Sequence, residues 1–466
     1  MKIVIISFFF SCVICGKCFG QLKSQTCETF ELSSIAFRLA GAEEYINNVI
    51  PAYTQDIDVY FAPYVEHDLI AYIKEIRKDY GIGYDAVMNA AACLTINNGD
   101  IVVKSDFDVS DIGKVDPRWT ADAYIKYVTR LNNFYKASRF NKFYNAHKPL
   151  YNVATKRLDR LLNQINIKWF ESFFGKELRR PTIVASLSNG RANYAYGITT
   201  EVTPPGIVIG CSAAKGLPIY SAYSTLPLIV HELSHGYSNA LLENAWDDSI
   251  SPAVMEIYSN VEEKMLEIGY GDPGIMLTEW FNNLCELMYF RENPSKSFDM
   301  NRRIARYQYR GFIWMERSVD FMDEFYENRS TFVTIKDYIP RLFVFINKTA
   351  SDFKKVIEEN NHKVPYVVET SPVSGTVLNS DKLVVKFSTP MFTHAYGMEK
   401  INEPDILLVP IKKEYWLNST TFVIEIDTKK LQKNKKYGIQ LHRQFFQSDA
   451  TYPLATHFNY LFLTAK

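Results

Sequence analysis

The spacing of apolar residues changes near residue 360, and this change divides the chain into two parts of different fold class. Before it, long stretches carry apolar residues every three or four positions, which is typical of amphipathic helices. The clearest of these stretches are residues 29–92, 123–165 and 252–352. After it, apolar residues alternate with polar ones in short runs separated by Pro, Gly, Asn and Ser, a pattern that favours antiparallel strands.

The helical part also contains two runs that favour strands. Residues 181–189 (PTIVASLSN) and 206–213 (GIVIGCSA) are short, rich in β-branched side chains and bounded by Gly, Pro and Asn. The sequence therefore predicts an α+β fold. A mainly helical domain with a small β-sheet would cover residues 21–360, and an all-β sandwich of immunoglobulin-like type would cover residues 361–466.

The first twenty residues have the pattern of a secretory signal peptide. A short basic start with Lys2 precedes the apolar run 3–14, and small residues precede the expected cleavage point at Gly20. A lipoprotein is less favoured, because Lys17 occupies a position where a small residue would be expected. We expect an exported protein, periplasmic or extracellular. No later run of apolar residues is long enough to predict a membrane-spanning segment after cleavage.

Composition excludes several classes of protein. The 466 residues include 52 Lys+Arg and 52 Asp+Glu, and 47% are hydrophobic. This apolar content is ample for a folded core, and the balanced charge offers no basic surface for nucleic acid. Four cysteines would remain after cleavage, and their spacing selects no disulfide pairing, so buried free thiols are expected. They are Cys27, Cys93, Cys211 and Cys285.

The strongest functional motif is His231-Glu232-Leu233-Ser234-His235. Ser224 or Thr225 is expected to cap a helix with Pro227 in its first turn. On that helix His231 and His235 are four residues apart, so both imidazoles project from one face.

Two imidazoles in this arrangement can chelate one Zn²⁺ ion, and Glu232 is offset so that it reaches the zinc-bound water. The ion lowers the pKa of that water toward about 7, and the carboxylate takes the proton. The alternative is a helix whose two histidines hydrogen-bond inside a packed core.

A site of this type needs a third protein ligand. The residues after His235 lack the continuation that places a third histidine in the metzincin class, so a glutamate from a later helix is expected. Glu286 is the first choice, because it lies in an apolar helix where an unpaired carboxylate would be costly. Glu256, at a spacing close to that of thermolysin, is the second choice, and Glu279 is the third.

Three other residues are candidates for supporting roles. Asn239, one turn after His235, could hydrogen-bond to a ligand, or it could simply end the helix. Tyr194 and Tyr196 lie between the two predicted strands, and a tyrosine hydroxyl there could stabilise a transition state. Packing is the alternative for both tyrosines.

Several stretches of the chain resemble a bacterial family of exported proteins that is known as a domain of unknown function and carries a gluzincin-like site. They are FELSSIAFRLAG (residues 30–41), PYVEHDLIAYIKEIRKDYGIGYDAVM (63–88), NYAYG (193–197), IVHELSHGYSNAL (229–241) and the helix from Trp280 through Glu286 to Arg291. The resemblance covers roughly residues 27–350. It implies that His231, His235 and Glu286 bind the metal and that Glu232 is the general base. Residues 367–391 separately resemble a bacterial immunoglobulin-like domain.

These observations predict an exported zinc-dependent hydrolase, in the first instance a metallopeptidase that acts on a peptide or protein substrate. One alternative is a binding or adhesion protein that keeps the zincin fold without activity. Another is a zinc amidase that acts on a non-peptide component of the cell wall. The immunoglobulin-like domain would dock a partner or a cell surface.

Overall fold

The computed structural model describes residues 22–177, 181–197, 205–246, 249–449 and 451–465. The predicted signal peptide therefore lies outside the described residues. The chain forms two compact units: unit 1 contains residues 1–165 and 180–221, and unit 2 contains residues 166–179 and 222–466. The predicted domain over residues 21–360 contributes residues to both units.

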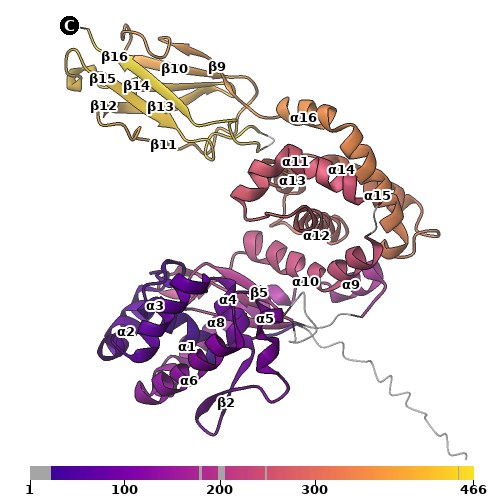
Figure 1. The fold of residues 1–466 in the computed structure, drawn as a ribbon. Helices are drawn as coiled ribbons and strands as arrows, with labels where there is room; N and C mark the ends of the chain where they lie inside the picture. Colours follow the sequence, from indigo (N-terminus) through magenta and orange to yellow (C-terminus); the bar gives the residue numbers. More distant parts are fainter. Residues whose placement is uncertain (1–21, 178–180, 198–204, 247–248, 450, 466) are drawn as a thin grey trace, which may run out of the picture. The chain divides into compact units, whose positions relative to one another are not determined.

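Unit 1 is mainly helical (Figure 1). Its α-helices are α1 (Glu28–Leu39), α2 (Pro51–Phe61), α3 (Asp68–Tyr80), α4 (Asp85–Ala92), α5 (Ile112–Val115), α6 (Ala121–Ala137), α7 (Phe140–Ala146) and α8 (Lys148–Leu162). Helix α3 ends before Gly81, whose φ of 66° is a conformation that glycine adopts without strain. Helix α6 begins where the Thr120 side chain accepts a hydrogen bond from the backbone N–H of Ala123.

A small sheet in unit 1 contains both predicted strands. Its order is β1 (Ser24–Gln25), β4 (Thr182–Ala185), β6 (Gly206–Ile209) and β5 (Asn193–Tyr196), with β5 antiparallel to β6 and the other pairs parallel. Two hairpins accompany it, β2 (Leu94–Asn97) with β3 (Asp100–Val103) and β7 (Ser212–Ala214) with β8 (Leu217–Ile219). The sequence did not predict β5, because Asn193–Tyr196 is too short to show an alternating pattern.

A buried carboxylate fixes the loop that follows β4. Glu31 of α1 is 1% exposed and accepts hydrogen bonds from the Ser186 hydroxyl and the Leu187 backbone N–H, both at 2.8 Å. The Tyr53 hydroxyl donates a third bond at 2.8 Å. These donors offset the cost of burying the charge, so Glu31 connects α1 to the sheet.

The helices of unit 2 surround one central helix. They are α9 (Ile167–Phe174), α10 (Ala222–Ala245), α11 (Ser251–Glu267), α12 (Pro273–Glu292), α13 (Met300–Tyr309), α14 (Met315–Glu327), α15 (Ile335–Ser351) and α16 (Phe353–Asn361). Helix α12 is buried almost continuously from Met276 to Phe290 and packs against α10, α11, α13 and α14. Figure 1 shows α12 nearly end-on between them. A helix that is apolar on most sides is stable in such a position because its neighbours cover every face.

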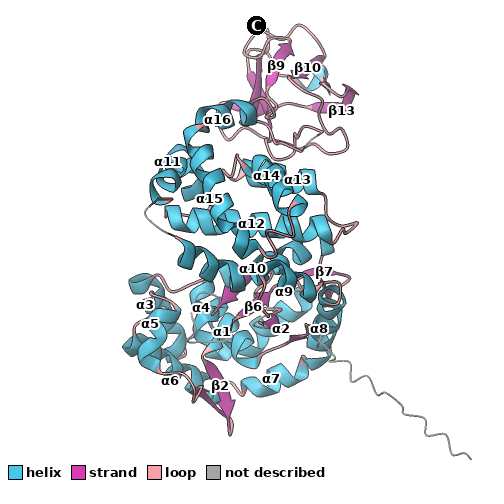
Figure 2. Cartoon of the chain, turned by 90° about the vertical axis from the view of Figure 1, so that its right-hand side faces the viewer, coloured by secondary structure: helices cyan, strands magenta, loops and turns pink. Residues whose placement is uncertain are grey.

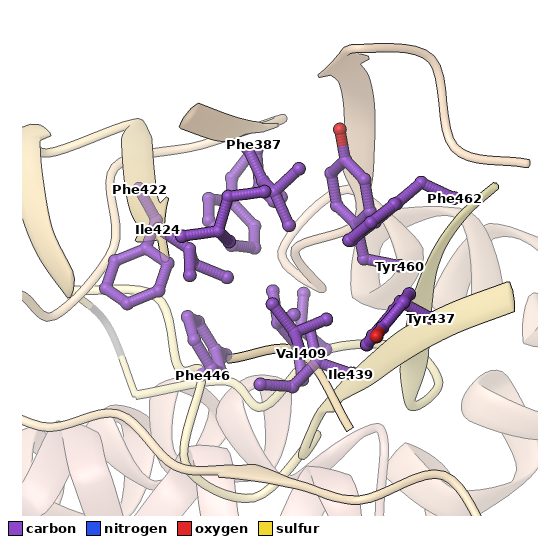
Figure 3. Packing of buried hydrophobic residues seen from close by; sticks show 14 of the residues in the cluster. Phe387, Val409, Phe422, Ile424, Tyr437, Ile439, Phe446, Tyr460 and Phe462 are labelled. Atoms are coloured by element: carbon purple, nitrogen blue, oxygen red, sulfur yellow. The ribbon is translucent and has the colours of Figure 1, made fainter. Parts of the chain in front are cut away.

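The rest of unit 2 is all-β, as the change in the spacing of apolar residues near residue 360 predicts (Figure 2). One sheet has the order β13 (Ile411–Asn418), β14 (Thr421–Ile426), β10 (Lys382–Phe387) and β9 (Val367–Ser371). In the other, β15 (Lys436–Leu441) pairs with β11 (Met398–Glu399), β12 (Ile406–Leu408) and β16 (Phe458–Leu463). Side chains from both sheets share one core, which includes Phe422, Ile424, Ile439 and Tyr460 (Figure 3). This is the arrangement of a β-sandwich.

Two further sequence predictions concern cysteines and membrane spans. Cys93, Cys211 and Cys285 are buried, Cys27 is half-buried, and all four are free thiols, as expected. Among the described helices, none combines the length and the apolar character that crossing a bilayer requires.

Candidate metal centre

Helix α10 carries the His231-Glu232-x-x-His235 motif in its middle. The helix starts at Ala222, so Pro227 lies inside it rather than in its first turn as predicted. Apolar side chains such as Ile229 and Leu233 are buried, and the helix packs against α12 of the same unit. The side chains of His231 and His235 remain 14% and 11% exposed. They are therefore accessible, unlike histidines sealed in a core.

The third side chain at the histidine pair is Glu279 of α12. Its carboxylate oxygens lie 3.4 Å from Nε2 of His231 and 3.5 Å from Nε2 of His235. The two Nε2 atoms are 3.1 Å apart, within hydrogen-bond distance of each other. Ligand atoms of a tetrahedral zinc site, at the usual bond lengths, are about 3.3–3.4 Å apart. Each Nε2 atom thus has a different oxygen of Glu279 beside it, Oε2 for His231 and Oε1 for His235, at about the spacing that neighbouring ligands of such a site require.

The first choice of third ligand, Glu286, has other partners in the structure. This carboxylate is fully buried and accepts hydrogen bonds from Nε and Nη2 of Arg303 at 2.6 and 2.8 Å. The hydroxyl of Tyr307 donates a further bond at 2.7 Å. The cost of burying this carboxylate is offset as the sequence analysis required, but by an arginine and a tyrosine of α13 instead of a metal.

The second choice, Glu256, is also not at the histidine pair. It lies on the exposed side of α11, where Oε1 accepts a hydrogen bond from Asn260, one turn along the same helix.

Arg291, at the end of the helix named in the resemblance, forms an ion pair with Asp323 at 2.7 Å.

The charges around the histidine pair are unusual. Burial acts to raise the pKa of Glu279, but His231, His235 and the Tyr270 hydroxyl outweigh it and lower that pKa to about 2. Burial acts to lower the pKa of His231, but its hydrogen bond to Glu279 and the nearby carboxylates outweigh burial and raise it. Within the described part of the chain, no lysine or arginine forms an ion pair with Glu232 or Glu279. With both imidazoles neutral, the site carries a surplus of negative charge that suits a cation.

A set of polar side chains surrounds the three candidate ligands. The Tyr270 hydroxyl donates to Glu279 at 2.9 Å. Nδ1 of His235 lies 3.0 Å from Oδ1 of Asn239, an acceptor. A proton on Nδ1 would leave the lone pair of Nε2 free to bind a metal. The side-chain nitrogen of Asn282 lies 2.9 Å from the same Nδ1 and donates to the Thr278 carbonyl at 2.9 Å.

The remaining candidates take different positions. Among the described residues, the Glu232 side chain has no hydrogen-bond or ion-pair partner, and its charge acts to raise the pKa of the adjacent His231. Tyr194 and Tyr196 belong to unit 1. Tyr196 is buried there against Phe30, and its hydroxyl bonds to Thr182, which is a packing role. Tyr194 is half-buried, and burial together with the Glu44 charge raises its pKa to about 12.

Glu279, the third choice from the sequence, is the glutamate that the structure places at the histidine pair, whereas Tyr270 and Asn282 were not among the sequence candidates. A periodic signal was present, because Glu279, Asn282 and Glu286 recur at helical spacing on one side of an otherwise apolar helix. These side chains form a row of polar groups along one face of α12, inside unit 2. It does not say which glutamate meets the histidines, since both lie on it.

Comparison with solved structures returns surface-layer proteins at low similarity. The structure of surface layer protein SbsC, domains 1–6, is 14% identical over 50% of this chain and 33% of its own length, with a TM-score of 0.17. The crystal structure of the S-layer protein rSbsC(31-844) is 10% identical over 86% of this chain and 46% of its own length, with a TM-score of 0.18. The chain thus spans less than half of either protein. No curated protein matches the sequence.

A family model gives a clearer result. The model described as domain of unknown function DUF4932 matches residues 24–345, which is more than half of the chain. The match includes α10 and α12 and therefore every candidate ligand described above. It agrees with the extent of the resemblance noted from the sequence. The chain belongs to the DUF4932 family.

Proposed function

We propose that this protein is a zinc-dependent hydrolase of gluzincin type, acting on peptide bonds, with His231, His235 and Glu279 as the metal ligands. The approach of the Glu279 carboxylate to both Nε2 atoms carries the proposal. The two Nε2 atoms are 3.1 Å apart, and each lies 3.4 or 3.5 Å from one oxygen of Glu279, distances that suit a single small cation. Two imidazoles and one carboxylate are also the donor set that zinc hydrolases use.

The chemistry divides between the metal and the chain. Bound zinc would supply Lewis acidity and make a water molecule more acidic. Glu232, next to His231 on α10 and free of other partners, would accept the proton of that water and pass it to the leaving amine. Asn239 would hold His235 in the tautomer that binds metal, and Tyr270 would orient the Glu279 carboxylate.

Two finer features belong to the same proposal. We assign the helical part that holds the site to the zincin class, because two helices supply the ligands, and the β-sandwich to the immunoglobulin-like class. We also propose that the protein is exported with residues 1–20 as its signal peptide. N-terminal sequencing of the secreted or periplasmic protein would test the export by finding a start near Gln21.

The decisive experiment compares wild type with Glu232→Gln. Metal content is measured by elemental analysis of the purified proteins, and cleavage is measured by mass spectrometry of a denatured protein mixture. We expect one zinc per site in both proteins and at least about a hundredfold loss of cleavage in Glu232→Gln, as for removal of a general base. Glu256→Gln, an exposed glutamate on α11, is the matched control and should retain both properties.

The other outcomes separate the alternatives. Zinc bound at the histidine pair without cleavage of any peptide would favour a binding protein or an amidase with a non-peptide substrate. Wild type that holds no metal even after incubation with zinc would refute the proposed site itself.

A further inference from the structure

A second group of metal-binding side chains lies on the β-sandwich, on three neighbouring strands. Leu441 of β15 pairs with Phe458 of β16, so the next residues outward along this antiparallel pair are His442 and His457. On the other side of β15, Glu399 of β11 pairs with Gln440. The backbone N–H of His442 continues that ladder by donating to the Gly397 carbonyl at 3.0 Å.

The pleat of the sheet places the three side chains on the same face. Side chains alternate along a strand, and residues directly opposite on adjacent strands share a face. Ile439 and Leu441 of β15 point into the sandwich core, so Gln440 and His442 point outward. Opposite pairing then puts Glu399 and His457 on that outer face as well.

The ligand atoms are close enough for one ion. Nε2 of His442 lies 3.8 Å from Oε1 of Glu399, and the two imidazole rings are 4.4 Å apart between centroids. One ligand atom from each of the three residues lies within 4.8 Å of the others. Metal–ligand bonds of 2.0–2.2 Å place ligand atoms about 3.3 Å apart in a tetrahedral site. Small rotations of the exposed side chains, which move their ligand atoms by roughly 1 Å, would bring these atoms to that spacing.

The backbone holds both histidines while leaving their rings accessible. His442 follows a central strand and contacts the Phe445 ring at 5.2 Å between centroids. Its side chain is 22% exposed, and that of Glu399 is 53% exposed. Such a site would retain open coordination positions for water, as expected for binding of moderate strength rather than for a closed structural centre.

We propose that Glu399, His442 and His457 form a second metal site that binds a divalent transition-metal ion such as Zn²⁺. The donor set of two imidazoles and a carboxylate excludes a preference for Ca²⁺ or Mg²⁺, which favour all-oxygen ligands. A bound ion would link β11 to the β15–β16 pair. This proposal does not depend on the site in α10 and α12, because it uses no residue of that site.

The test is zinc binding by the full-length protein, measured by equilibrium dialysis against ZnCl₂ followed by elemental analysis. Wild type should bind one more equivalent than His442→Ala or His457→Ala, and the affinity for that equivalent should fall at least about tenfold in either variant. His394→Ala removes another histidine of the sandwich and should bind as wild type does. Circular dichroism would verify the fold of each variant, with His442→Gln as a more conservative change.

Equal zinc stoichiometry and affinity in wild type, His442→Ala and His457→Ala would overturn the proposal. Repeating the measurement in Glu279→Gln separates the two sites. Loss of the α10–α12 site should leave the equivalent that depends on His442 in place.

Discussion

Glu279 and Glu286 lie two turns apart on the same face of α12, yet their surroundings differ in kind. Glu286 is fully buried and paired with Arg303, a cation at every accessible pH. Glu279 is 16% exposed, and its basic neighbours are imidazoles, which unlike a guanidinium can be neutral. A carboxylate with a permanent cation is already neutralised. One whose partners are titratable retains a charge that a metal ion can balance.

The comparison gives a rule for choosing among acidic residues on a buried helix. Burial shows that a carboxylate must have partners, but the partners decide what it does. An arginine and a tyrosine make Glu286 part of a structural ion pair, whereas a pair of imidazoles with solvent access fits the metal-ligand role that we propose for Glu279. The predictions below test this division, starting with the largest expected effect.

Replacing Glu286 by Gln should destabilise the protein strongly. The substitution leaves the Arg303 guanidinium buried without its counter-charge, which costs about 3–5 kcal/mol in the free energy of unfolding. Urea denaturation of the metal-free protein measures this loss. Zinc affinity of the folded variant should change little. A variant with normal stability that fails to bind zinc would reverse the roles of the two glutamates.

Replacing Glu279 by Gln should have the opposite profile. Loss of a direct ligand should weaken zinc binding by more than about a hundredfold, beyond the 10–100-fold typical of residues that only support a ligand. Competition with a chromophoric chelator gives the affinity. Zinc should also raise the melting temperature of wild type more than that of the variant. Glu256→Gln serves as the control, and an unchanged affinity in Glu279→Gln would exclude this residue as a ligand.

Replacing Asn239 by Ala should weaken zinc binding about tenfold, because His235 loses the Oδ1 acceptor that would favour its metal-binding tautomer. The same chelator competition measures it. Asn260→Ala, an exposed asparagine on α11, is a suitable control. If the zinc affinity of the variant equals that of wild type, the contact between His235 and Asn239 plays no part in metal binding.

Replacing Tyr270 by Phe should have the smallest effect. It removes one hydroxyl that donates to Glu279 at 2.9 Å and leaves the ring in place. A hydrogen bond of this kind contributes roughly 1 kcal/mol, which corresponds to about a fivefold change in zinc affinity. An effect as large as that of Glu279→Gln would mean that Tyr270 fixes the whole carboxylate and not one oxygen of it.

The sequence was informative where chemistry and helical period coincide. His231, Glu232 and His235 are contiguous on α10, so their shared face follows from residue spacing alone. The choice between Glu279 and Glu286 does not, because it depends on Arg303 and Tyr307, which come from a different helix. No periodicity in α12 reveals where α13 will pack.

The same limit applies to the way the chain divides into two units. The alternation after residue 360 correctly predicted an all-β part, since strand period is local information. The division at residues 221 and 222 is not local, because β4 and β6 belong with β1, whereas α10 packs on α12. Strands and helices that are adjacent in the chain therefore separate into different units.

Each unit is built from segments that are not consecutive in the chain, and this delays folding during synthesis. Strand β1 starts at Ser24, but its partner β4 starts at Thr182. At the usual rate of synthesis, about 5–20 residues per second, roughly 8–30 s pass between the synthesis of β1 and that of β4. Helix α9 is made in between but belongs to unit 2, so it must wait for α10. Neither unit can close while the first two hundred residues are being translated, and the emerging chain stays open to whatever factors bind unfolded protein.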